Sequence, residues 1–325
     1  MAETVTPEFK DRLLSLGLAR VSEAAAIAAA KLMGRGDEKA ADAAAVDAMR
    51  DQLNQLEIKG VVVIGEGERD EAPMLYIGEE VGAGNGPEVD IALDPLEGTT
   101  LAAKAMPNAL TVIAMAPRGS LLHAPDVYMD KIAVGPGYPK DVVSLDATPE
   151  ENVRALAKAK GVSPEGISVC VLERPRHEAL ISALRSTGAG VRLITDGDVA
   201  GVIHTADAEN SGVDMYIGSG GAPEGVLAAA ALKCMGGQIQ GRLLFRNDAE
   251  RGRARKAGIE DLNRIYRLDD MVRADVIFAA TGVTDGSFLR GARRTRTHME
   301  TETVLMRSKT GSVRRMSYRT PLERL

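Results

Sequence analysis

Short, almost uninterrupted apolar runs constrain the fold of this chain more than any other feature of its sequence. Val61–Gly65, Val89–Asp94 and Leu110–Ala116 are such runs, and glycine or proline bounds each of them. Runs of this kind are typical of strands buried on both faces of a sheet. Because helical and strand-like segments alternate along the chain, the sequence predicts an α/β protein.

The pattern predicts the order of most elements. Two helices, 8–33 and 39–56, precede the first strands. From about residue 149 onward the alternation is regular. Helices are expected at 149–160, 177–186, 199–205 and 223–235, strands at 167–172, 191–195, 215–218, 239–245 and 276–280, and a final hairpin at 303–307 and 313–318. A break between Pro139 and Pro149 divides the chain into two closely packed halves, 1–145 and 146–325.

Composition narrows the classes of function. The net charge is −6, so no overall positive potential that would attract nucleic acid is expected. Only 3 % of the 325 residues are aromatic and there is no Trp, so a surface of aromatic side chains that stack on bases is not expected either. Two cysteines cannot form a disulfide framework, which suits a reducing cytoplasm. The N-terminus lacks the apolar core of a signal peptide, and the longest apolar runs have seven residues. We therefore expect no membrane segment.

Several kinds of catalytic site are missing from the sequence. The four histidines form no pair at metal-ligand spacing, and there is neither a GxSxG nucleophile motif nor a P-loop. Carboxylates at strand ends take their place. Glu66 follows the first apolar run, Asp94 ends the second with Glu97 three residues later, and Glu224 opens a helix after a glycine-rich turn. Such groups without Cys or His ligands favour hard cations, so Mg²⁺ or Mn²⁺ is expected.

Each carboxylate also has a simpler interpretation. Asp42 on the second helix is more often a solvated residue, Glu224 a helix N-terminal charge, and Asp94 before Pro95 a turn former. The set is harder to explain in that way. DPLEGT (94–99) places two carboxylates and a hydroxyl within six residues of one strand end, which turn formation does not require.

The DPLEGT string resembles a motif of the lithium-sensitive, metal-dependent sugar and inositol phosphatase superfamily. Six further motifs stand before and after it in the same order as in one family of this superfamily, and together they resemble the class II fructose-1,6-bisphosphatases of the GlpX type from about residue 18 to 320. These motifs are GRGDEKAAD (34–42), IGEGERDEAPMLYIGEEVG (64–82), HAPDVYMDKIAVGPG (123–137), RPRH (174–177), DGDVA (196–200) and GGAPEG (220–225).

The resemblance implies a layered αβαβα sugar-phosphatase fold. It also implies metal-dependent hydrolysis of fructose 1,6-bisphosphate to fructose 6-phosphate by a cytoplasmic homo-oligomer, a dimer or tetramer. Metal ligation is implied for Asp42 and Glu66 at one ion, and for Asp94, Glu97 and Glu224 at another. Asp70 and Thr99 match positions that activate the attacking water. Substrate contacts are implied for Glu97, Gly98, Thr99, Tyr128, Arg174, Pro175, Arg176, Asp196, Gly197, Asp198 and Gly221.

The chain departs from the family pattern at a few positions. Glu38 displaces Lys39 by one place, Thr100 stands where some members have Arg, Arg174 replaces Lys, and Ser219 replaces an aliphatic residue. None of these changes removes an expected metal ligand.

Three alternatives stay open at the level of sequence. The substrate can be sedoheptulose 1,7-bisphosphate, alone or as a second substrate, or an inositol phosphate. The Asp196-Gly197-Asp198 string after an apolar run also suggests a phosphatase that forms an aspartyl phosphate, although that mechanism requires Thr or Val where Ala200 stands. A regulator that binds sugar phosphates without turnover is a third class, and the intact set of carboxylates argues against it.

Overall fold

The computed structural model describes residues 9, 11–67 and 75–324. The chain forms two compact units, one of residues 1–122 and 273–325 and the other of residues 123–272. This grouping differs from the expected division at residue 145. The C-terminal segment belongs with the N-terminal one because β11 (Ile277–Gly282) pairs along its whole length with β4 (Leu110–Pro117).

The first unit is one sheet with a layer of two helices. The sheet order is β12-β13-β11-β4-β3-β1-β2, with β14 added on β13. Its other strands are β1 (Lys59–Ile64), β2 (Glu80–Val81), β3 (Glu88–Glu97), β12 (Arg293–Arg294), β13 (His298–Arg307) and β14 (Ser312–Pro321). Only the β1–β3 pairing is parallel among those described within this sheet.

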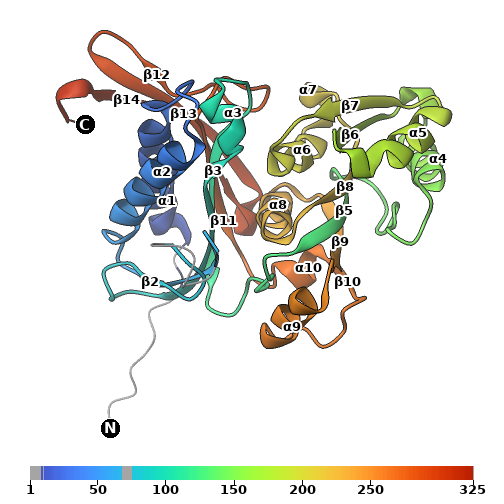
Figure 1. Ribbon diagram of the computed structural model, residues 1–325, viewed down its shortest axis with the longest axis horizontal. Coiled ribbons are helices and arrows are strands. Elements are labelled where there is room, and N and C mark those ends of the chain that lie inside the picture. Colours follow the sequence, from blue (N-terminus) through green and yellow to red (C-terminus); the bar gives the residue numbers. More distant parts are fainter. Residues whose placement is uncertain (1–8, 10, 68–74, 325) are drawn as a thin grey trace. The chain divides into compact units, whose positions relative to one another are not determined.

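Helices α1 (Asp11–Ala30) and α2 (Glu38–Leu53) lie side by side on one face of this sheet (Figure 1). Asp37 begins α2 by accepting a hydrogen bond from the Ala40 N–H through its side chain, as N-cap residues do. By length and apolar composition α1 could cross a membrane. In the structure, however, its Leu18 and Val21 are buried in a core cluster with Ile91 of β3 and Ile277 of β11.

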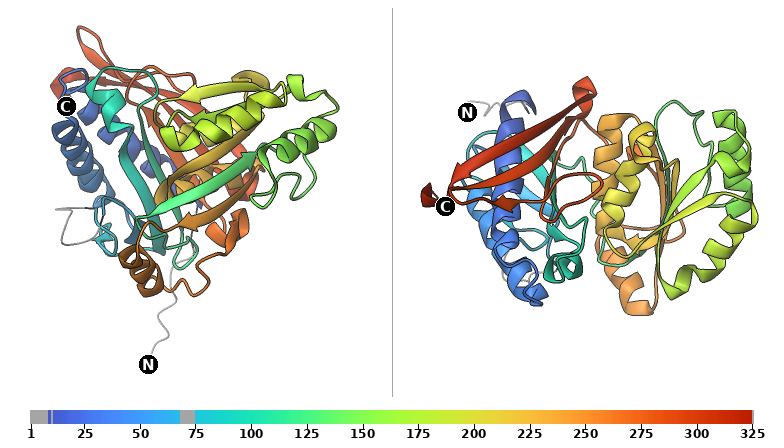
Figure 2. Two further views of the ribbon diagram at one scale, coloured as in Figure 1. Left: turned by 45° about the vertical axis from the view of Figure 1, so that its right-hand side comes forward. Right: turned by 90° about the horizontal axis from the view of Figure 1, so that it is seen from above.

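The second unit is a sheet between two helix layers, as the right-hand view of Figure 2 shows. The sheet order is β10-β9-β5-β8-β6-β7. Its strands are β5 (Tyr128–Val134), β6 (Ser168–Leu172), β7 (Gly190–Ile194), β8 (Met215–Gly221), β9 (Gln238–Leu244) and β10 (Ile265–Arg267). The helices are α4 (Pro149–Lys160), α5 (Glu178–Ser186), α6 (Asp198–Thr205), α7 (Ala208–Ser211), α8 (Ala222–Met235), α9 (Asp248–Lys256) and α10 (Leu268–Met271).

Successive side chains of β6 point alternately toward the two helix layers. Val169 and Val171 belong to a buried cluster with Leu156 of α4 and Leu184 of α5. Cys170, between those two valines, faces the other way, because a side chain on Gly201 of α6 would lie 3.3 Å from its sulfur. The α/β class predicted from the sequence is confirmed.

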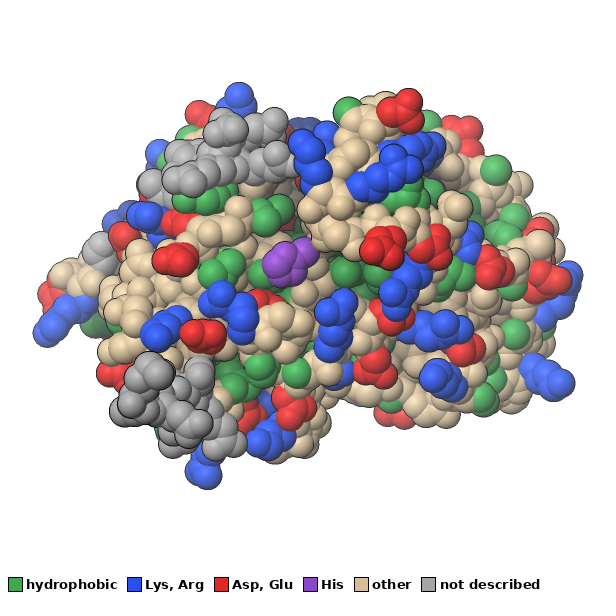
Figure 3. Space-filling view, turned by 90° about the horizontal axis from the view of Figure 1, so that it is seen from below, with side chains coloured by type: hydrophobic (Ala, Val, Ile, Leu, Met, Phe, Trp, Pro, Cys, Tyr) green, Lys and Arg blue, Asp and Glu red, His purple; other side chains and the backbone are tan. Residues whose placement is uncertain are grey.

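Most predicted elements are present, with ends that differ by a few residues. The sequence pattern did not predict β5, β10, the short β2 and β12, or helices α3 (Thr99–Ala103), α7, α9 and α10. On the face shown in Figure 3, basic and acidic side chains are interspersed rather than gathered into one field.

Candidate metal and sugar-phosphate sites

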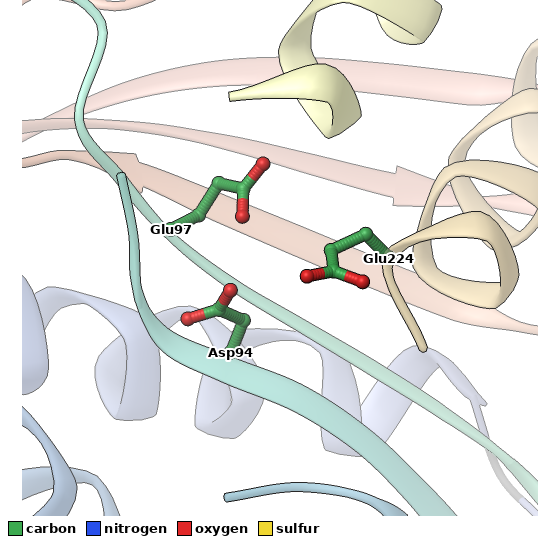
Figure 4. Close-up of side chains that lie close together, drawn as sticks. All are labelled: Asp94, Glu97 and Glu224. Atoms are coloured by element: carbon green, nitrogen blue, oxygen red, sulfur yellow. The ribbon is translucent and has the colours of Figure 1, made fainter. Parts of the chain in front are cut away.

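The end of β3 carries the DPLEGT string and is bent by a β-bulge. Asp94 lies opposite Val112 of β4 and Glu97 opposite Leu110, so β3 has one residue more than its partner between these pairs. The Leu96 N–H donates to Asp94 Oδ1 over 3.0 Å, and the Thr111 hydroxyl donates to the Pro95 carbonyl over 2.9 Å. Bulges re-aim side chains. Here the bend leaves a carboxylate oxygen of Asp94 within 4.8 Å of one from Glu97 (Figure 4).

A strand-to-helix turn follows directly. Gly98 has a φ of +83°, a left-handed conformation that suits glycine, and an added Cβ would lie 2.9 Å from the Leu101 side chain. Thr99 is then the first residue of α3 (Thr99–Ala103). The three consecutive residues expected to contact substrate, Glu97, Gly98 and Thr99, therefore lie at one turn beside the Asp94 carboxylate.

Asp42 of α2 lies close enough to Asp94 for their charges to interact. Burial, and to a smaller extent the negative charge of Asp94, raise the pKa of Asp42 to about 6. Glu66 follows β1, which runs parallel to β3 and pairs with it from Lys59 to Ile64, so both strands end at the same edge of the sheet. Asp70 lies outside the described residues.

The chemistry of this donor set fits a hard divalent cation. All its side-chain ligands are carboxylate oxygens, and the negative charge of Asp94 makes ionisation of Asp42 more costly when no cation is present. A divalent ion would offset that repulsion. The first unit thus holds four of the five expected ligands, namely Asp42, Glu66, Asp94 and Glu97.

The fifth expected ligand, Glu224, lies in the second unit. It is in the first turn of α8, where the helix dipole favours a negative charge. A Cβ on Gly221 would lie 1.9 Å from Glu224 Oε2, so only glycine at position 221 lets the carboxylate take this place. Figure 4 shows Glu224 leaving the start of α8.

The remaining predicted residues gather at one edge of the second sheet. Strands β6, β7 and β8 run parallel, and β5 runs antiparallel to β8, so β5 begins where the other three end. Tyr128 starts β5 opposite Gly221, the last residue of β8. Arg174, Pro175 and Arg176 follow β6, and Asp196, Gly197 and Asp198 follow β7. The structure therefore brings these expected substrate contacts together.

Two arginines after β6 are held in place by different partners. Arg174 donates to the Thr195 carbonyl and lies 3.6 Å from Asp196, so it joins the ends of β6 and β7. Arg176 donates from Nε to the Ser219 hydroxyl over 2.9 Å and from Nη2 to the Ser219 carbonyl over 2.7 Å. The Arg176 guanidinium carbon also lies 4.9 Å from the centroid of the Tyr128 ring.

His177, which follows Arg176, connects this loop to the ends of β6 and β8 through hydrogen bonds. The Ser219 N–H donates to His177 Nε2 over 2.9 Å, and Nδ1 lies 2.7 Å from the Leu172 carbonyl. Since a carbonyl only accepts, the proton of the neutral ring lies on Nδ1. Burial lowers the pKa of His177, which keeps the ring neutral.

Asp198 has a partner, Lys131, that the sequence pattern did not predict. Lys131 of β5 donates to the Asp198 carboxylate, and both side chains are buried. Lys131 also donates to the Gly221 carbonyl over 2.9 Å, so one ammonium group links the two strand ends. Lys131 lies in the HAPDVYMDKIAVGPG motif, which includes strand β5. The adjacent charged residues Asp130 and Lys131 interrupt its apolar pattern, so the strand was not predicted.

These features define an α/β protein with oxygen ligands for a divalent metal and a separate set of arginines on a second sheet. The sequence model described as bacterial fructose-1,6-bisphosphatase, glpX-encoded, matches residues 12–320. The chain is 46 % identical over 319 residues to fructose-1,6-bisphosphatase 1 class 2 of Escherichia coli K12, covering 94 % of each chain. It has the same identity and coverage with the class 2 enzyme of Shigella flexneri.

The chain therefore belongs to the glpX-encoded family of bacterial fructose-1,6-bisphosphatases. Among solved structures, an inositol monophosphatase from Anabaena is similar with 17 % identity and a TM-score of 0.31, over 60 % of this chain and 71 % of the other.

Proposed function

We propose that this protein hydrolyses fructose 1,6-bisphosphate to fructose 6-phosphate and phosphate, with Mg²⁺ or Mn²⁺ as cofactor. The observation that carries the proposal is the combination of family membership with the carboxylates at the end of β3. Asp42 and Glu66 would hold one ion, and Asp94, Glu97 and Glu224 another. When bound, a divalent metal would neutralise part of the phosphate charge and lower the pKa of a water molecule bound to it.

The residues of the chain would orient the reactants. Thr99 would hold the attacking water through its hydroxyl, and Asp70 would accept the proton. The position of Thr99 at the Gly98 turn, next to Glu97, supports this assignment for the hydroxyl.

The edge of the second sheet would bind the sugar and the phosphate that is not cleaved. Arg174 and Arg176 would bind this distal phosphate, since guanidinium groups form paired hydrogen bonds with phosphate. Asp196 and Asp198 would accept hydrogen bonds from sugar hydroxyls. Tyr128, Pro175, Gly197 and Gly221, together with Gly98, would shape the pocket.

The finer properties rest on the family alone. We propose a cytoplasmic enzyme that acts as a dimer or tetramer and binds neither nucleic acid nor membrane. Sedoheptulose 1,7-bisphosphate is a second candidate substrate, since only the size of the sugar pocket separates the two.

A phosphate-release assay with a panel of substrates tests the proposal. Fructose 1,6-bisphosphate, sedoheptulose 1,7-bisphosphate and an inositol monophosphate are each incubated with the protein, with EDTA and after addition of Mg²⁺ or Mn²⁺. We expect release from fructose 1,6-bisphosphate that EDTA abolishes and metal restores. Full activity in a chelated sample would contradict the metal requirement. Binding of the sugar without any release would identify a regulator.

A further inference from the structure

One segment at the edge of the second sheet has no role in the expected set of substrate contacts. Strand β9 is antiparallel to β5, as β8 is, so β9 also ends at the edge where Tyr128 begins β5. Leu244, the last residue of β9, lies opposite Tyr128. Two residues further on is Arg246, which neither the motifs nor the resemblance singled out.

Arg246 and Arg176 share one aromatic ring. The guanidinium carbon of Arg246 lies 5.2 Å from the centroid of the Tyr128 ring, and that of Arg176 lies 4.9 Å from it. Both contacts are within the range of cation–π attraction. The two positive groups therefore lie within about 10 Å of each other, the sum of these two distances, although they come from different strands.

The guanidinium of Arg246 is fixed in place. Glu250 of α9 is fully buried, at 1 % exposure, and its Oε1 accepts a hydrogen bond from Arg246 Nε over 2.7 Å. Its Oε2 accepts from the Arg246 backbone N–H over 2.7 Å. The Arg246 side chain itself is 63 % exposed. Arg246 Nη2 also lies 2.6 Å from Glu250 Oε1. An exposed arginine that a buried carboxylate holds through Nε and Nη2 is prepared for an anion at its remaining N–H groups, because little side-chain freedom is lost on binding.

The chemistry of the pair favours a phosphate. Arg176 uses Nε and one Nη2 hydrogen on the neutral Ser219, which leaves its positive charge unbalanced by that partner. Glu250 already balances the charge of Arg246, so a phosphate bound between the two guanidinium groups would balance the charge of Arg176 and accept the N–H groups that Glu250 leaves free on Arg246. The simpler interpretation of Arg246 is a surface ion pair at the start of α9, which would serve stability alone.

We propose that Arg246 is a further phosphate-binding residue, which binds the distal phosphate of the sugar bisphosphate together with Arg176. The inference rests on the proposed function and adds to it a residue from the segment after β9. It predicts that Arg246 contributes to binding of the distal phosphate and not to the chemistry at the other end of the substrate.

The test compares ligands that differ in the distal phosphate. The variants are Arg246→Gln, Arg246→Lys and, as a control on the exposed face of α9, Arg255→Gln. Calorimetric titration with fructose 6-phosphate measures binding of the distal phosphate without turnover. Phosphate release from fructose 1,6-bisphosphate and from fructose 1-phosphate, which lacks the distal phosphate, measures kcat and KM.

We expect Arg246→Gln to raise the Kd for fructose 6-phosphate and the KM for the bisphosphate about 10-fold, the effect of a lost charge-assisted hydrogen bond. Its kcat should stay within about 2-fold, and its kcat/KM on fructose 1-phosphate should not change. Arg246→Lys should lie between wild type and Arg246→Gln, since it keeps the charge but not the planar geometry. Arg255→Gln should match wild type.

Two results would overturn the inference. One is an unchanged Kd for fructose 6-phosphate in Arg246→Gln. The other is an equal loss on both substrates, which would show that Arg246 only stabilises α9. Failure of the proposed function gives a different result, namely a wild-type protein that releases no phosphate from the bisphosphate, and the titration with fructose 6-phosphate is then still decisive for Arg246.

Discussion

Ser219 shows how a single small side chain can position larger ones. Its hydroxyl accepts from Arg176 Nε and lies 3.0 Å from His177 Nε2, while its backbone N–H donates to the same ring nitrogen. In the sequence, Ser219 stands out only as a departure from the aliphatic residue of the family pattern. Its role depends on the approach of the loop after β6 to the end of β8, which no local pattern reveals.

Removing the Ser219 hydroxyl should loosen Arg176 without unfolding the loop. In Ser219→Ala, the backbone contacts to His177 and to Arg176 Nη2 are kept, and the two hydrogen bonds of the hydroxyl, with Arg176 Nε and with His177 Nε2, are lost. We expect the KM for fructose 1,6-bisphosphate to rise about 2- to 10-fold, as a hydrogen bond of ~0.5–1.5 kcal/mol implies, with kcat unchanged. Steady-state kinetics measure this. A matching rise in KM for fructose 1-phosphate would contradict the link to the distal phosphate.

Thr99 offers a test at the other end of the substrate. Thr99→Val keeps the shape of the side chain and deletes the hydroxyl that would orient the water. We expect kcat to fall about 10²-fold or more, with KM and metal affinity nearly constant. Thr100→Val, one residue further along α3, is the control and should be much milder. An unchanged kcat in Thr99→Val would leave the hydroxyl with a packing or turn role.

At the scale of elements, the ends of β3 and β4 were predictable and β5 was not. The apolar runs predicted the ends of these strands to within a few residues, because charged side chains are rare in a strand that is buried on both faces. Strand β5 carries Asp130 and Lys131 at its centre. Its burial depends on Asp198, which is 67 residues away and neutralises Lys131. A sequence pattern cannot supply a partner at that distance.

The contact between α1 and β13 contains a buried acid whose effect on stability we can predict. Burial raises the pKa of Glu23 to about 7, although a hydrogen bond from the Thr303 hydroxyl and the charge of Arg20 oppose the shift. Because the pKa in the folded state is above its ordinary value of 4.5, the folded state disfavours ionisation. Stability associated with the protonated acid is present below pH 4.5 and is lost as the pH rises to 7.

Glu23→Gln should remove this dependence, since glutamine keeps the shape and stays neutral. We expect the variant to gain stability relative to wild type between pH 4.5 and 7, by at most about 3 kcal/mol at pH 8. Thermal unfolding across this pH range measures the difference. Glu57→Gln, at an exposed position, should show no such trend, and parallel profiles for Glu23→Gln and wild type would contradict the prediction.

At the scale of the whole molecule, the boundaries between the two compact units differ from the boundary at residue 145 that was expected from the sequence. Residues 123–272 are inserted between β4 and β11, and the two crossing points are adjacent, since the Arg273 N–H donates to the Ser120 carbonyl over 2.8 Å. The expected division at residue 145 follows the break between Pro139 and Pro149. The return of the chain to its first sheet rests on pairing between residues more than 150 positions apart, such as Val112 and Ala280.

Metal binding should also change the stability of the folded protein as a whole. In the metal-free protein the pKa of Asp42 is raised to about 6 by burial and by Asp94. The stability associated with protonated Asp42 is therefore present below pH 3.8, its ordinary pKa, and is lost as the pH rises to about 6. A divalent cation competes with this proton, so metal affinity should fall as the pH drops below 6.

Differential scanning calorimetry of the EDTA-treated protein tests this coupling. At pH 7.5, Mg²⁺ or Mn²⁺ at about 100 times its Kd should stabilise the fold by ~2.7 kcal/mol and raise Tm by several degrees, because only the folded state holds the ligands together. At pH 5 the same metal concentration should raise Tm much less. Asp42→Asn should reduce the rise at pH 7.5, whereas Asp47→Asn, at an exposed position on the same helix, should not. A Tm that metal leaves unchanged at both pH values would remove the basis for a metal site at the end of β3.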